Sequence, residues 1–292
     1  MFVLNVIGKG AEPGLFRGLD NGPPKILSPS FAFDLPLPNS GAEYEALTEA
    51  RSRAESFALD INLVRANKRR KKLLVADMDS TIINVECLDE LADMAGLKAQ
   101  IAAITERAMR GELEFESALR ERVGMLKGLK LDALEKAWIE RVRLNPGAKS
   151  LIATMRAHGA HTLLVSGGFG YFTRRVAEAA GFHAERGNTL LDDGERLTGE
   201  VGTPILGRAA KLEALEEAVA RLDIDFAESL AVGDGANDLA MIQKADKNGG
   251  LGVAYHAKPV VAATAGAAID HNDLAALLYL QGYGDDEIAR LD

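Results

Sequence analysis

Four short apolar runs, each followed at once by polar residues, constrain the fold of this chain more than any other feature. Their length and texture are typical of buried parallel strands. Helical patterns lie between them, so strands and helices alternate along the chain. This alternation predicts an α/β fold with a doubly wound parallel sheet, in which ligands bind beyond the carboxyl ends of the strands. The predicted strands are 73–76, 161–165, 229–232 and 251–255, and the predicted helices 148–158, 171–180 and 209–222.

Two segments interrupt this alternation. Residues 84–144 carry helical patterns without a strand signal, and they are too long for a simple crossover. We therefore predict an inserted helical cap at about 84–145, within a core domain of residues 69–292. The second interruption predicts a β-hairpin, because two strand-like runs flank the turn residues Asp193 and Gly194.

The first 68 residues have a different character and are expected to form a small N-terminal region. A strand is predicted at 2–7, followed by irregular, extended chain, because glycine and proline are dense up to residue 40. Helical periodicity then runs from about 44 to 57, with Ser40 as its cap. The basic run at 68–72 is expected to be a solvated approach to the next strand.

The charge balance and the cysteine count exclude several function classes. The chain has 34 Lys and Arg residues against 43 Asp and Glu residues, a net charge of -9, which disfavours nucleic-acid partners. No apolar run approaches the roughly 20 residues of a membrane span, and no secretory signal is recognisable. The single cysteine, Cys87, cannot form an internal disulfide, which fits a reducing compartment. We expect a cytoplasmic protein that binds neither nucleic acid nor membrane.

Carboxylates follow two of the predicted strands. Asp77 and Asp79 are two residues apart in extended chain, so both can face one point. Asp234 and Asp238 lie in a Gly-Asp-Gly stretch after a later strand. If the two strands are neighbours, carboxylates about 5 Å apart repel by roughly 3 kcal/mol at an effective dielectric near 20. Such a cluster needs a cation, and hard oxygen ligands select Mg²⁺ or a similar ion.

A phosphate-binding pattern follows another predicted strand. Ser166 is followed by Gly167 and Gly168, and a hydroxyl with unobstructed backbone amides at a helix start suits a phosphate group. Lys211 lies in a predicted helix and indicates nothing by itself. Taken singly, each of these patterns also occurs in ordinary loops, but three polar groups at successive strand ends of one sheet are difficult to explain by chance.

These motifs resemble those of the haloacid-dehalogenase superfamily, and within it the phosphoserine phosphatases. The four family motifs appear in order at 77–81, 166–168, 211 and 233–238, and the similarity covers about 73–269, roughly two-thirds of the chain. The resemblance implies the Rossmannoid core of that superfamily with a helical cap. It also implies a Mg²⁺-dependent phosphoric monoester hydrolase.

The resemblance assigns a role to each motif residue. Asp77 would be the nucleophile that forms an aspartyl-phosphate, and Asp79 the general acid and base. The implied metal ligands are Asp77, the backbone carbonyl of Asp79, and Asp234, with Asp238 in support. The implied phosphoryl ligands are Ser166, Gly167 and Lys211, and Asn237 is expected beside them.

The cap is expected to select the substrate. By resemblance, Glu86 would bind the ammonium group of phosphoserine and Arg122 its carboxylate, with Met109 and Phe115 as apolar walls. Arg122 lies beside the stripe that begins at Phe115, so its side chain could reach the cleft. The implied reaction is hydrolysis of O-phospho-L-serine to L-serine and phosphate, the last step of serine biosynthesis by the phosphorylated route.

Two other functions remain open at this stage. A phosphotransferase of the same fold would pass the phosphate of phosphoserine to another alcohol. A non-catalytic protein would only sense phosphoserine or serine. The N-terminal region departs from the family pattern, and we expect a degenerate or truncated ACT-like module there, which leaves a homodimer open.

Overall fold

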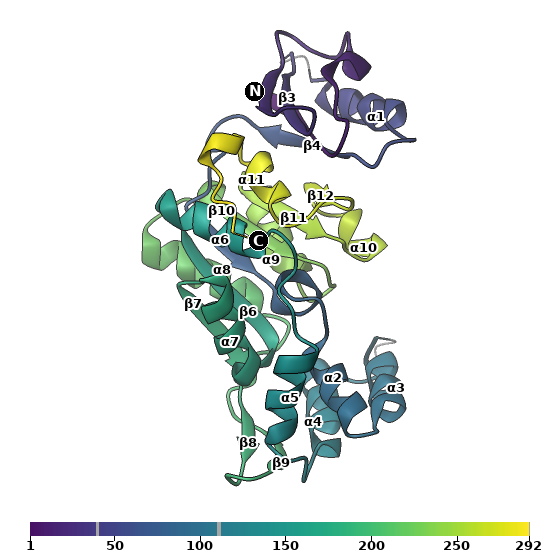
Figure 1. Cartoon of the computed structure of the whole chain (residues 1–292), viewed down its shortest axis with the longest axis vertical. Helices are drawn as coiled ribbons and strands as arrows, with labels where there is room; N and C mark the ends of the chain where they lie inside the picture. Colours follow the sequence, from purple (N-terminus) through teal and green to yellow (C-terminus); the bar gives the residue numbers. More distant parts are fainter. Residues whose placement is uncertain (39–40, 110–111, 292) are drawn as a thin grey trace.

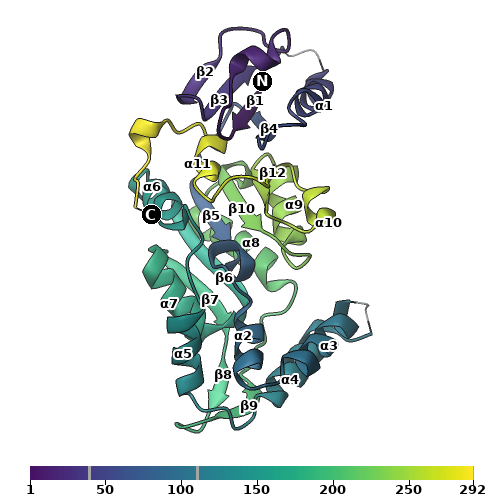
Figure 2. The same cartoon turned by 45° about the vertical axis from the view of Figure 1, so that its right-hand side comes forward.

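The computed structural model describes residues 1–38, 41–109 and 112–291, apart from the side chain of Met109. Three regions follow one another along the long axis of the molecule, as Figure 1 shows. The N-terminal region lies at one end, the parallel sheet with its helices lies in the middle, and the cap lies at the other end (Figure 2).

The middle region is a six-stranded sheet in which every neighbouring pair is parallel. The strand order is β12-β11-β10-β5-β6-β7, so the direction of winding reverses between β5 and β10. This confirms the doubly wound sheet, and the reversal places a binding crevice at the carboxyl ends of β5 and β10. The strands are β5 (Leu73–Ala76), β6 (His161–Phe169), β7 (Ala184–Asn188), β10 (Ser229–Gly233), β11 (Leu251–Tyr255) and β12 (Ala267–Ile269).

Helices cover both faces of this sheet and explain why its strands are apolar on both sides. In β5, the side chain of Leu74 packs into one core and that of Val75 into the other. The strand interior is therefore dry on both faces, which is the condition for a parallel sheet. The first core contains α6 (Ala148–Ala157) and α7 (Gly170–Ala180); the second contains α8 (Ala210–Leu222), α9 (Leu239–Lys247) and α10 (Pro259–Ala262).

The predicted helical insertion lies between β5 and α6. Its two connections to the core run side by side, because Ile83 pairs with Leu144 and the Asn84 N–H donates to the Arg143 carbonyl at 3.1 Å. The predicted hairpin at Asp193-Gly194 is also present, and it packs on the helix α4. The elements are α2 (Cys87–Met94), α3 (Lys98–Met109), α4 (Phe115–Met125), α5 (Asp132–Glu140), β8 (Leu190–Asp192) and β9 (Leu197–Val201).

The N-terminal region is more regular than its sequence predicts. Its four strands form an antiparallel sheet in the order β2-β3-β1-β4. This is the ferredoxin-like β-α-β-β-α-β arrangement with its first helix reduced to four residues. The prediction of irregular chain after the first strand was wrong, because the glycines and prolines lie mainly in the turns between short strands. The elements are β1 (Phe2–Ile7), η1 (Pro13–Phe16), β2 (Lys25–Ser28), β3 (Ala32–Pro36), α1 (Glu43–Arg53) and β4 (Asp60–Arg65). Ser40, the predicted cap of α1, lies outside the described residues.

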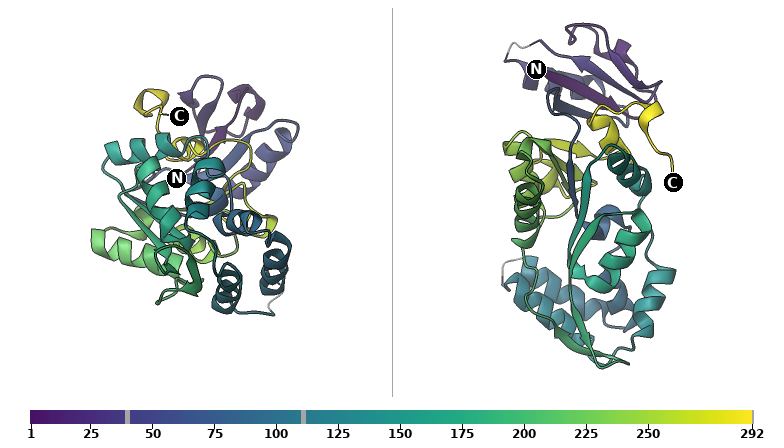
Figure 3. Two further views of the ribbon diagram at one scale, coloured as in Figure 1. Left: turned by 60° about the horizontal axis from the view of Figure 1, so that its bottom comes forward. Right: turned by 90° about the vertical axis from the view of Figure 1, so that its left-hand side faces the viewer.

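Buried polar side chains join this region to the core. The carboxamide of Asn62 donates to the Ala268 carbonyl at 2.9 Å and accepts from the Ala268 N–H at 2.8 Å, so β4 and β12 meet edge to edge. The Asp60 carboxylate accepts backbone N–H bonds from residues 270, 271 and 272. Arg69 forms a bidentate ion pair with Asp34, one bond at 2.7 Å. The two regions therefore share a polar interface. The right-hand view of Figure 3 shows the ribbon of the N-terminal region beside the C-terminal segment and the core.

The basic run at 68–72 is part of this junction, so the prediction of a solvated strand approach was wrong for two of its members. Arg69 is largely buried against Asp34, and Lys71 is buried with its ammonium group bonded to the carbonyls of Lys68 and Ala227. A run of like charges in sequence does not reveal which of its members meets a partner from a distant strand.

The C-terminal segment closes the junction. The helix α11 (Ala276–Leu280) is wholly buried, and the Tyr279 carbonyl accepts from Asn5 of β1 at 3.2 Å. Short 3-10 turns, η3 (Phe226–Glu228) and η4 (Asp285–Glu287), complete the structure. The longest described helix, α8, has 13 residues, and no described helix is both long and apolar enough to cross a bilayer.

The interface predicts a stability effect for Asp60. Asp60→Ala should lower the free energy of unfolding by about 2–3 kcal/mol, because it leaves buried N–H donors without a charged acceptor. Chemical denaturation of the full chain measures this difference. Asp20→Ala, which removes an exposed acceptor in the same region, is the control and should change it little. Equal stability of the two variants would contradict the role of Asp60.

Candidate active site

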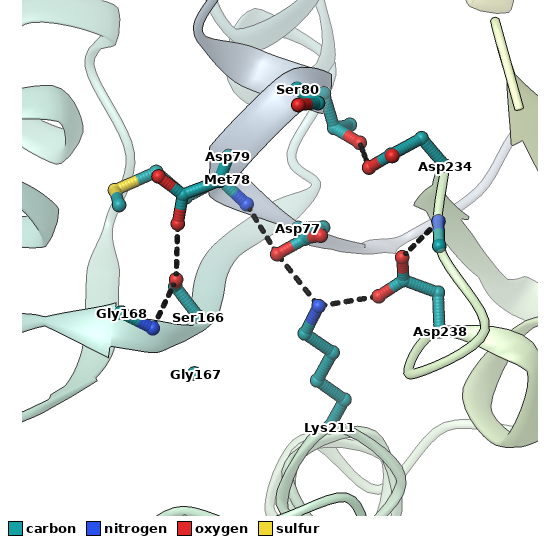
Figure 4. A network of polar contacts seen from close by, with 12 residues as sticks. Asp77, Met78, Asp79, Ser80, Ser166, Gly167, Gly168, Lys211, Asp234 and Asp238 are labelled. Carbon is teal, nitrogen blue, oxygen red and sulfur yellow. Dashed lines mark hydrogen bonds and ion pairs between the residues drawn. The ribbon is translucent and has the colours of Figure 1, made fainter. Parts of the chain in front are cut away.

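Four segments meet at the carboxyl ends of the central strands. Asp77 and Asp79 follow β5, Ser166 to Gly168 lie at the end of β6, and the 233–238 loop follows β10. Lys211 approaches from the first turn of α8. Figure 4 shows these side chains directed toward one another from four different elements. The fold thus brings together the residues of all four sequence motifs.

Lys211 is the centre of a buried ion cluster. Its ammonium lies 2.7 Å from Asp77 Oδ1 and 2.5 Å from Asp238 Oδ1, and all three residues are buried. Burial alone would lower the pKa of Lys211, but the attraction of Asp77 and Asp238 outweighs it, so the pKa is raised and the ammonium stays charged. Asp238 is fixed in turn by the Gly235 N–H at 2.9 Å.

Three carboxylates converge beside this lysine. Oxygen atoms of Asp77, Asp234 and Asp238 all lie within 4.8 Å of one another. Burial first, and then the charge of Asp238, raise the pKa of both Asp77 and Asp234, so the ionised cluster is short of positive charge. An oxygen-only donor set with excess negative charge fits a hard divalent cation such as Mg²⁺. The cluster therefore suits a metal ion. The Thr81 hydroxyl helps to orient the Asp234 carboxylate by donating to it at 3.0 Å.

Asp79 lies on the other side of Asp77 and has different partners. One carboxylate oxygen accepts from the Cys87 N–H at 2.9 Å, and the other from the Ser166 hydroxyl at 3.0 Å. Burial outweighs these bonds and raises the pKa of Asp79. A carboxyl group with a raised pKa can hold a proton near neutral pH, as a general acid must. The turn that presents it contains Ser80 with φ of 56°, a strained conformation of the kind found at functional sites.

The serine-glycine segment forms a compact cradle. The Gly168 N–H donates to Ser166 Oγ at 2.8 Å, which aims the serine hydroxyl at Asp79. A β-carbon on Gly167 would lie 3.2 Å from the ring of Phe115 in the cap. The cap therefore touches the cradle, and glycine at this position leaves room for that contact.

A cavity of about 170 Å³ lies between the cap and these groups. This is smaller than the roughly 300–1,000 Å³ typical of sites for drug-sized ligands, so it suits a small metabolite. Its walls carry charges of both signs, from Glu86 and Arg122, beside apolar surface from Phe115. The lining residues are Asp77, Asp79, Glu86, Leu88, Phe115, Leu119, Arg122, Ser166, Gly167, Gly168, Phe169 and Asn237.

The two cap residues with opposite charge, Glu86 and Arg122, have different surroundings. Glu86 faces the open cavity and accepts from the Ser80 hydroxyl at 2.7 Å. Although Glu86 is exposed to the cavity, protein atoms surround its carboxylate and displace part of its hydration. This desolvation, followed by the charge of Asp79, raises the pKa of Glu86 to about 7. Arg122 is half-buried, and its guanidinium donates to the Ala118 carbonyl at 3.3 Å. Burial lowers the pKa of Arg122, while Asp89 and Glu86 oppose that shift.

The sequence-predicted residues are therefore mostly found together. Asp238, predicted as a supporting residue, lies within the carboxylate cluster itself. Met109, predicted as an apolar wall, has its side chain outside the described part of the chain. Sequence reasoning missed Leu88 and Leu119 as cavity walls, the Cys87 N–H that binds Asp79, and the Thr81 hydroxyl that binds Asp234. Thr81 could have been noticed, because it directly follows the Asp-x-Asp-Ser segment.

Comparisons with known proteins agree with this geometry. A model for the haloacid dehalogenase-like hydrolases matches residues 74–243 of the chain. A phosphoserine phosphatase of Polaromonas sp. is 45% identical over 214 residues, which are 72% of this chain and 89% of that protein. The family match therefore spans the cap and all four motifs, from β5 to α9.

Solved structures resemble almost the whole chain. A haloacid-dehalogenase-family hydrolase of Salmonella enterica serovar Typhi has a TM-score of 0.83 at 30% identity, covering 96% of this chain and 98% of that one. An unliganded probable phosphoserine phosphatase of Vibrio cholerae has a TM-score of 0.78 at 32% identity, covering 96% and 86%. Because 96% of the chain is covered, the similarity extends into the N-terminal region as well as the catalytic core.

The carboxylate cluster predicts metal-dependent stability. Mg²⁺ should raise the midpoint of thermal unfolding, because an ion that binds only the folded state stabilises it by mass action. In Asp234→Asn most of this rise should be lost, since one charged ligand is removed. Thermal unfolding followed by circular dichroism, with and without Mg²⁺, measures both. Glu178→Gln, a change of an exposed acid on α7, should keep the full response; an equal response in Asp234→Asn would refute the metal site.

Proposed function

Because the chain belongs to the haloacid dehalogenase-like hydrolase family, we propose that it hydrolyses O-phospho-L-serine to L-serine and phosphate. The observation that carries this proposal is the cavity itself. It is small, it opens onto Asp77 and Asp79, and its cap side presents Glu86 and Arg122. A substrate for it needs a phosphate, an ammonium and a carboxylate within a few bonds of one another, and phosphoserine has all three.

In the first step Asp77 would attack the phosphorus atom of the substrate. The bond from phosphorus to the serine oxygen breaks as the bond to the Asp77 carboxylate forms, giving an aspartyl-phosphate. Asp79 would donate its proton to the departing serine oxygen, for which its raised pKa is suited. L-Serine leaves as the neutral alcohol, and Asp79 is left as a carboxylate.

In the second step Asp79 would act as the base. Its carboxylate takes a proton from a water molecule, whose oxygen attacks the phosphorus of the aspartyl-phosphate. The bond to Asp77 breaks, phosphate is released, and both carboxyl groups return to their starting states. Splitting the reaction this way replaces one difficult displacement by two easier ones.

Fixed positive charge and hydrogen-bond donors would stabilise the transferring phosphoryl group. Lys211 reaches Asp77 at 2.7 Å, so its ammonium lies beside the atoms that react. The Ser166 hydroxyl and the Gly167 amide would face the phosphoryl oxygens. Mg²⁺, held by Asp77, Asp234 and the Asp79 carbonyl, would supply further neutralisation of the phosphate charge.

Substrate selection would rest on the cap. Glu86 would accept hydrogen bonds from the ammonium of phosphoserine, and Arg122 would bind its carboxylate in a bidentate manner. Phe115 and Leu119 would enclose the short carbon chain. The sensor alternative is less favoured, because the acid, the nucleophile and the cradle are all in place. A phosphotransferase would use the same residues and is distinguished by its products. Homodimerisation, an ACT-like N-terminal role and a cytoplasmic location remain predictions.

The central prediction is a metal-dependent release of phosphate and serine in equal amounts. O-Phospho-L-serine with Mg²⁺ should yield both products without any added acceptor, while EDTA or Asp77→Asn should abolish turnover, because the nucleophile or its charge partner is lost. A coupled phosphate assay with amino-acid analysis measures both products. Hydrolysis of other small phosphate esters but not of phosphoserine would reject the substrate; no hydrolysis of any ester would favour the sensor.

Glu86 predicts a pH dependence. Its pKa of about 7 means that the carboxylate forms as pH rises, and only the carboxylate attracts the ammonium of the substrate. The ratio of kcat/KM between wild type and Glu86→Gln should therefore rise from pH 6 to pH 8, reaching about tenfold to a hundredfold. Taking the ratio cancels ionisations that both proteins share.

A matched substrate provides the control for Glu86. With para-nitrophenyl phosphate, which has no ammonium group, the same ratio should stay near unity at every pH. A ratio for phosphoserine that is independent of pH would show that Glu86 does not bind the ammonium in its charged form.

A further inference from the structure

The phosphate cradle lies in an interruption of the sheet. Strands β6 and β7 pair as far as Val165 and Arg186, and pairing resumes at Phe169 and Asn188. Three residues of β6, 166–168, thus stand opposite a single residue of β7. Such a bulge releases peptide groups from the ladder. They become available to a ligand, but the sheet no longer sets their orientation.

Asn188 supplies the missing constraint. Its side chain is buried, with 2% of the residue exposed, and its Nδ2 donates to the Gly167 carbonyl at 2.8 Å. The Gly167 carbonyl belongs to the same peptide group as the Gly168 N–H, which donates to Ser166 Oγ. This peptide is therefore held at both ends, by Asn188 on its oxygen and by Ser166 on its hydrogen. Linked hydrogen bonds of this kind reinforce one another.

The same carboxamide also holds the approach to Lys211. Asn188 Oδ1 accepts from the Leu206 N–H at 2.7 Å, and Nδ2 lies 3.4 Å from the Leu206 carbonyl. Leu206 precedes the first turn of α8, which carries Lys211. One side chain thus anchors both the cradle and the segment that delivers the lysine, although these motifs are far apart in sequence.

The end of β7 has little freedom to move. A β-carbon on Gly187 would lie 2.8 Å from the Thr173 side chain and 3.0 Å from the Gly170 nitrogen. The strand therefore passes directly against the start of α7. Asn188 projects from this tightly packed point, so its amide is a rigid reference for the two segments that it binds.

We propose that Asn188 is a positioning residue for phosphoryl transfer, which sets the Ser166–Gly168 cradle and the Lys211 approach in one fixed arrangement. This inference rests on the proposed function in one respect: it requires that a phosphoryl group is transferred at this site. It does not require that the substrate is phosphoserine. An amide suits this position, because its nitrogen donates to the Gly167 carbonyl while its oxygen accepts from the Leu206 N–H. Asn188 acts on the phosphoryl side of the site, so its effect does not depend on the leaving group.

The test replaces this amide by an acid of the same shape. Asn188→Asp keeps the acceptor but turns a carboxylate oxygen toward the Gly167 carbonyl. We expect kcat to fall by about tenfold to a hundredfold, the size of effect that a misplacement of roughly 1 Å can have. The loss should be similar for O-phospho-L-serine and para-nitrophenyl phosphate. Calorimetry should also show weaker binding of inorganic phosphate.

Asn62 offers a matched control. Its buried carboxamide pairs with both backbone groups of Ala268, as that of Asn188 does with Leu206, but it lies in the junction between the sheets. Asn62→Asp should lower the midpoint of thermal unfolding while kcat stays within about twofold of wild type. A merely structural role of Asn188 would make the two variants behave alike.

The outcomes separate this proposal from the proposed substrate. If wild type hydrolyses para-nitrophenyl phosphate but not O-phospho-L-serine, the proposed substrate is rejected. The effect of Asn188→Asp on kcat is then measured with para-nitrophenyl phosphate. A folded Asn188→Asp protein with wild-type kcat and phosphate affinity overturns the proposal, as does a loss confined to one leaving group. If Asn188→Asp is unfolded at the assay temperature, Asn188→Ser, which is too short to reach both partners and adds no charge, is judged by the same criteria.

Discussion

The site depends on one buried ammonium held between two carboxylates. Lys211 lies within 2.7 Å of Asp77 and Asp238, and none of the three has appreciable contact with solvent. Buried charges are costly unless each is closely paired, so a small error in backbone position would be expensive here. The three residues come from the end of β5, from α8 and from the loop before α9. Their meeting therefore requires that the parallel sheet and its crossover helices be correctly packed before the charges can be satisfied.

The cap meets a different requirement, since it must present groups that recognise a substrate beside this charge cluster. Glu86 and Arg122 line the cavity from the residue before α2 and from α4. Asp79 has hydrogen-bond partners in both the phosphate cradle and the cap. Its carboxylate accepts from the cradle through Ser166 and from the cap through the Cys87 N–H. The cap is thereby tied to the residue with the properties of a general acid.

Much of the fold and most of the site could be predicted from sequence. Buried parallel strands appear as short apolar runs, and several of the site residues directly follow these runs. The strands predicted at 73–76 and 251–255 are found at those positions, and the carboxylates Asp77 and Asp234, which follow β5 and β10, do converge. Elements defined by tertiary context were not predictable. The edge strand β7 is half-buried and mainly polar, and β12 is apolar but has three residues, too few to show a strand pattern. Likewise, Arg69 and Lys71 become buried because the fold brings Asp34 to the first and the Ala227 carbonyl of η3 to the second.

Asparagine illustrates why such residues escape sequence reasoning. At Asn62 and at Asn188 a side-chain amide replaces a backbone partner where a sheet is interrupted, once between two sheets and once at a bulge. In sequence an asparagine beside a strand end indicates a turn, because its side chain readily competes with backbone hydrogen bonds. That same capacity lets it substitute for a strand when it is buried. The cradle must leave the ladder to be free for a phosphate, and something outside the ladder must then hold it. A buried amide meets both conditions, because it fixes the peptide without occupying the face on which a ligand would bind.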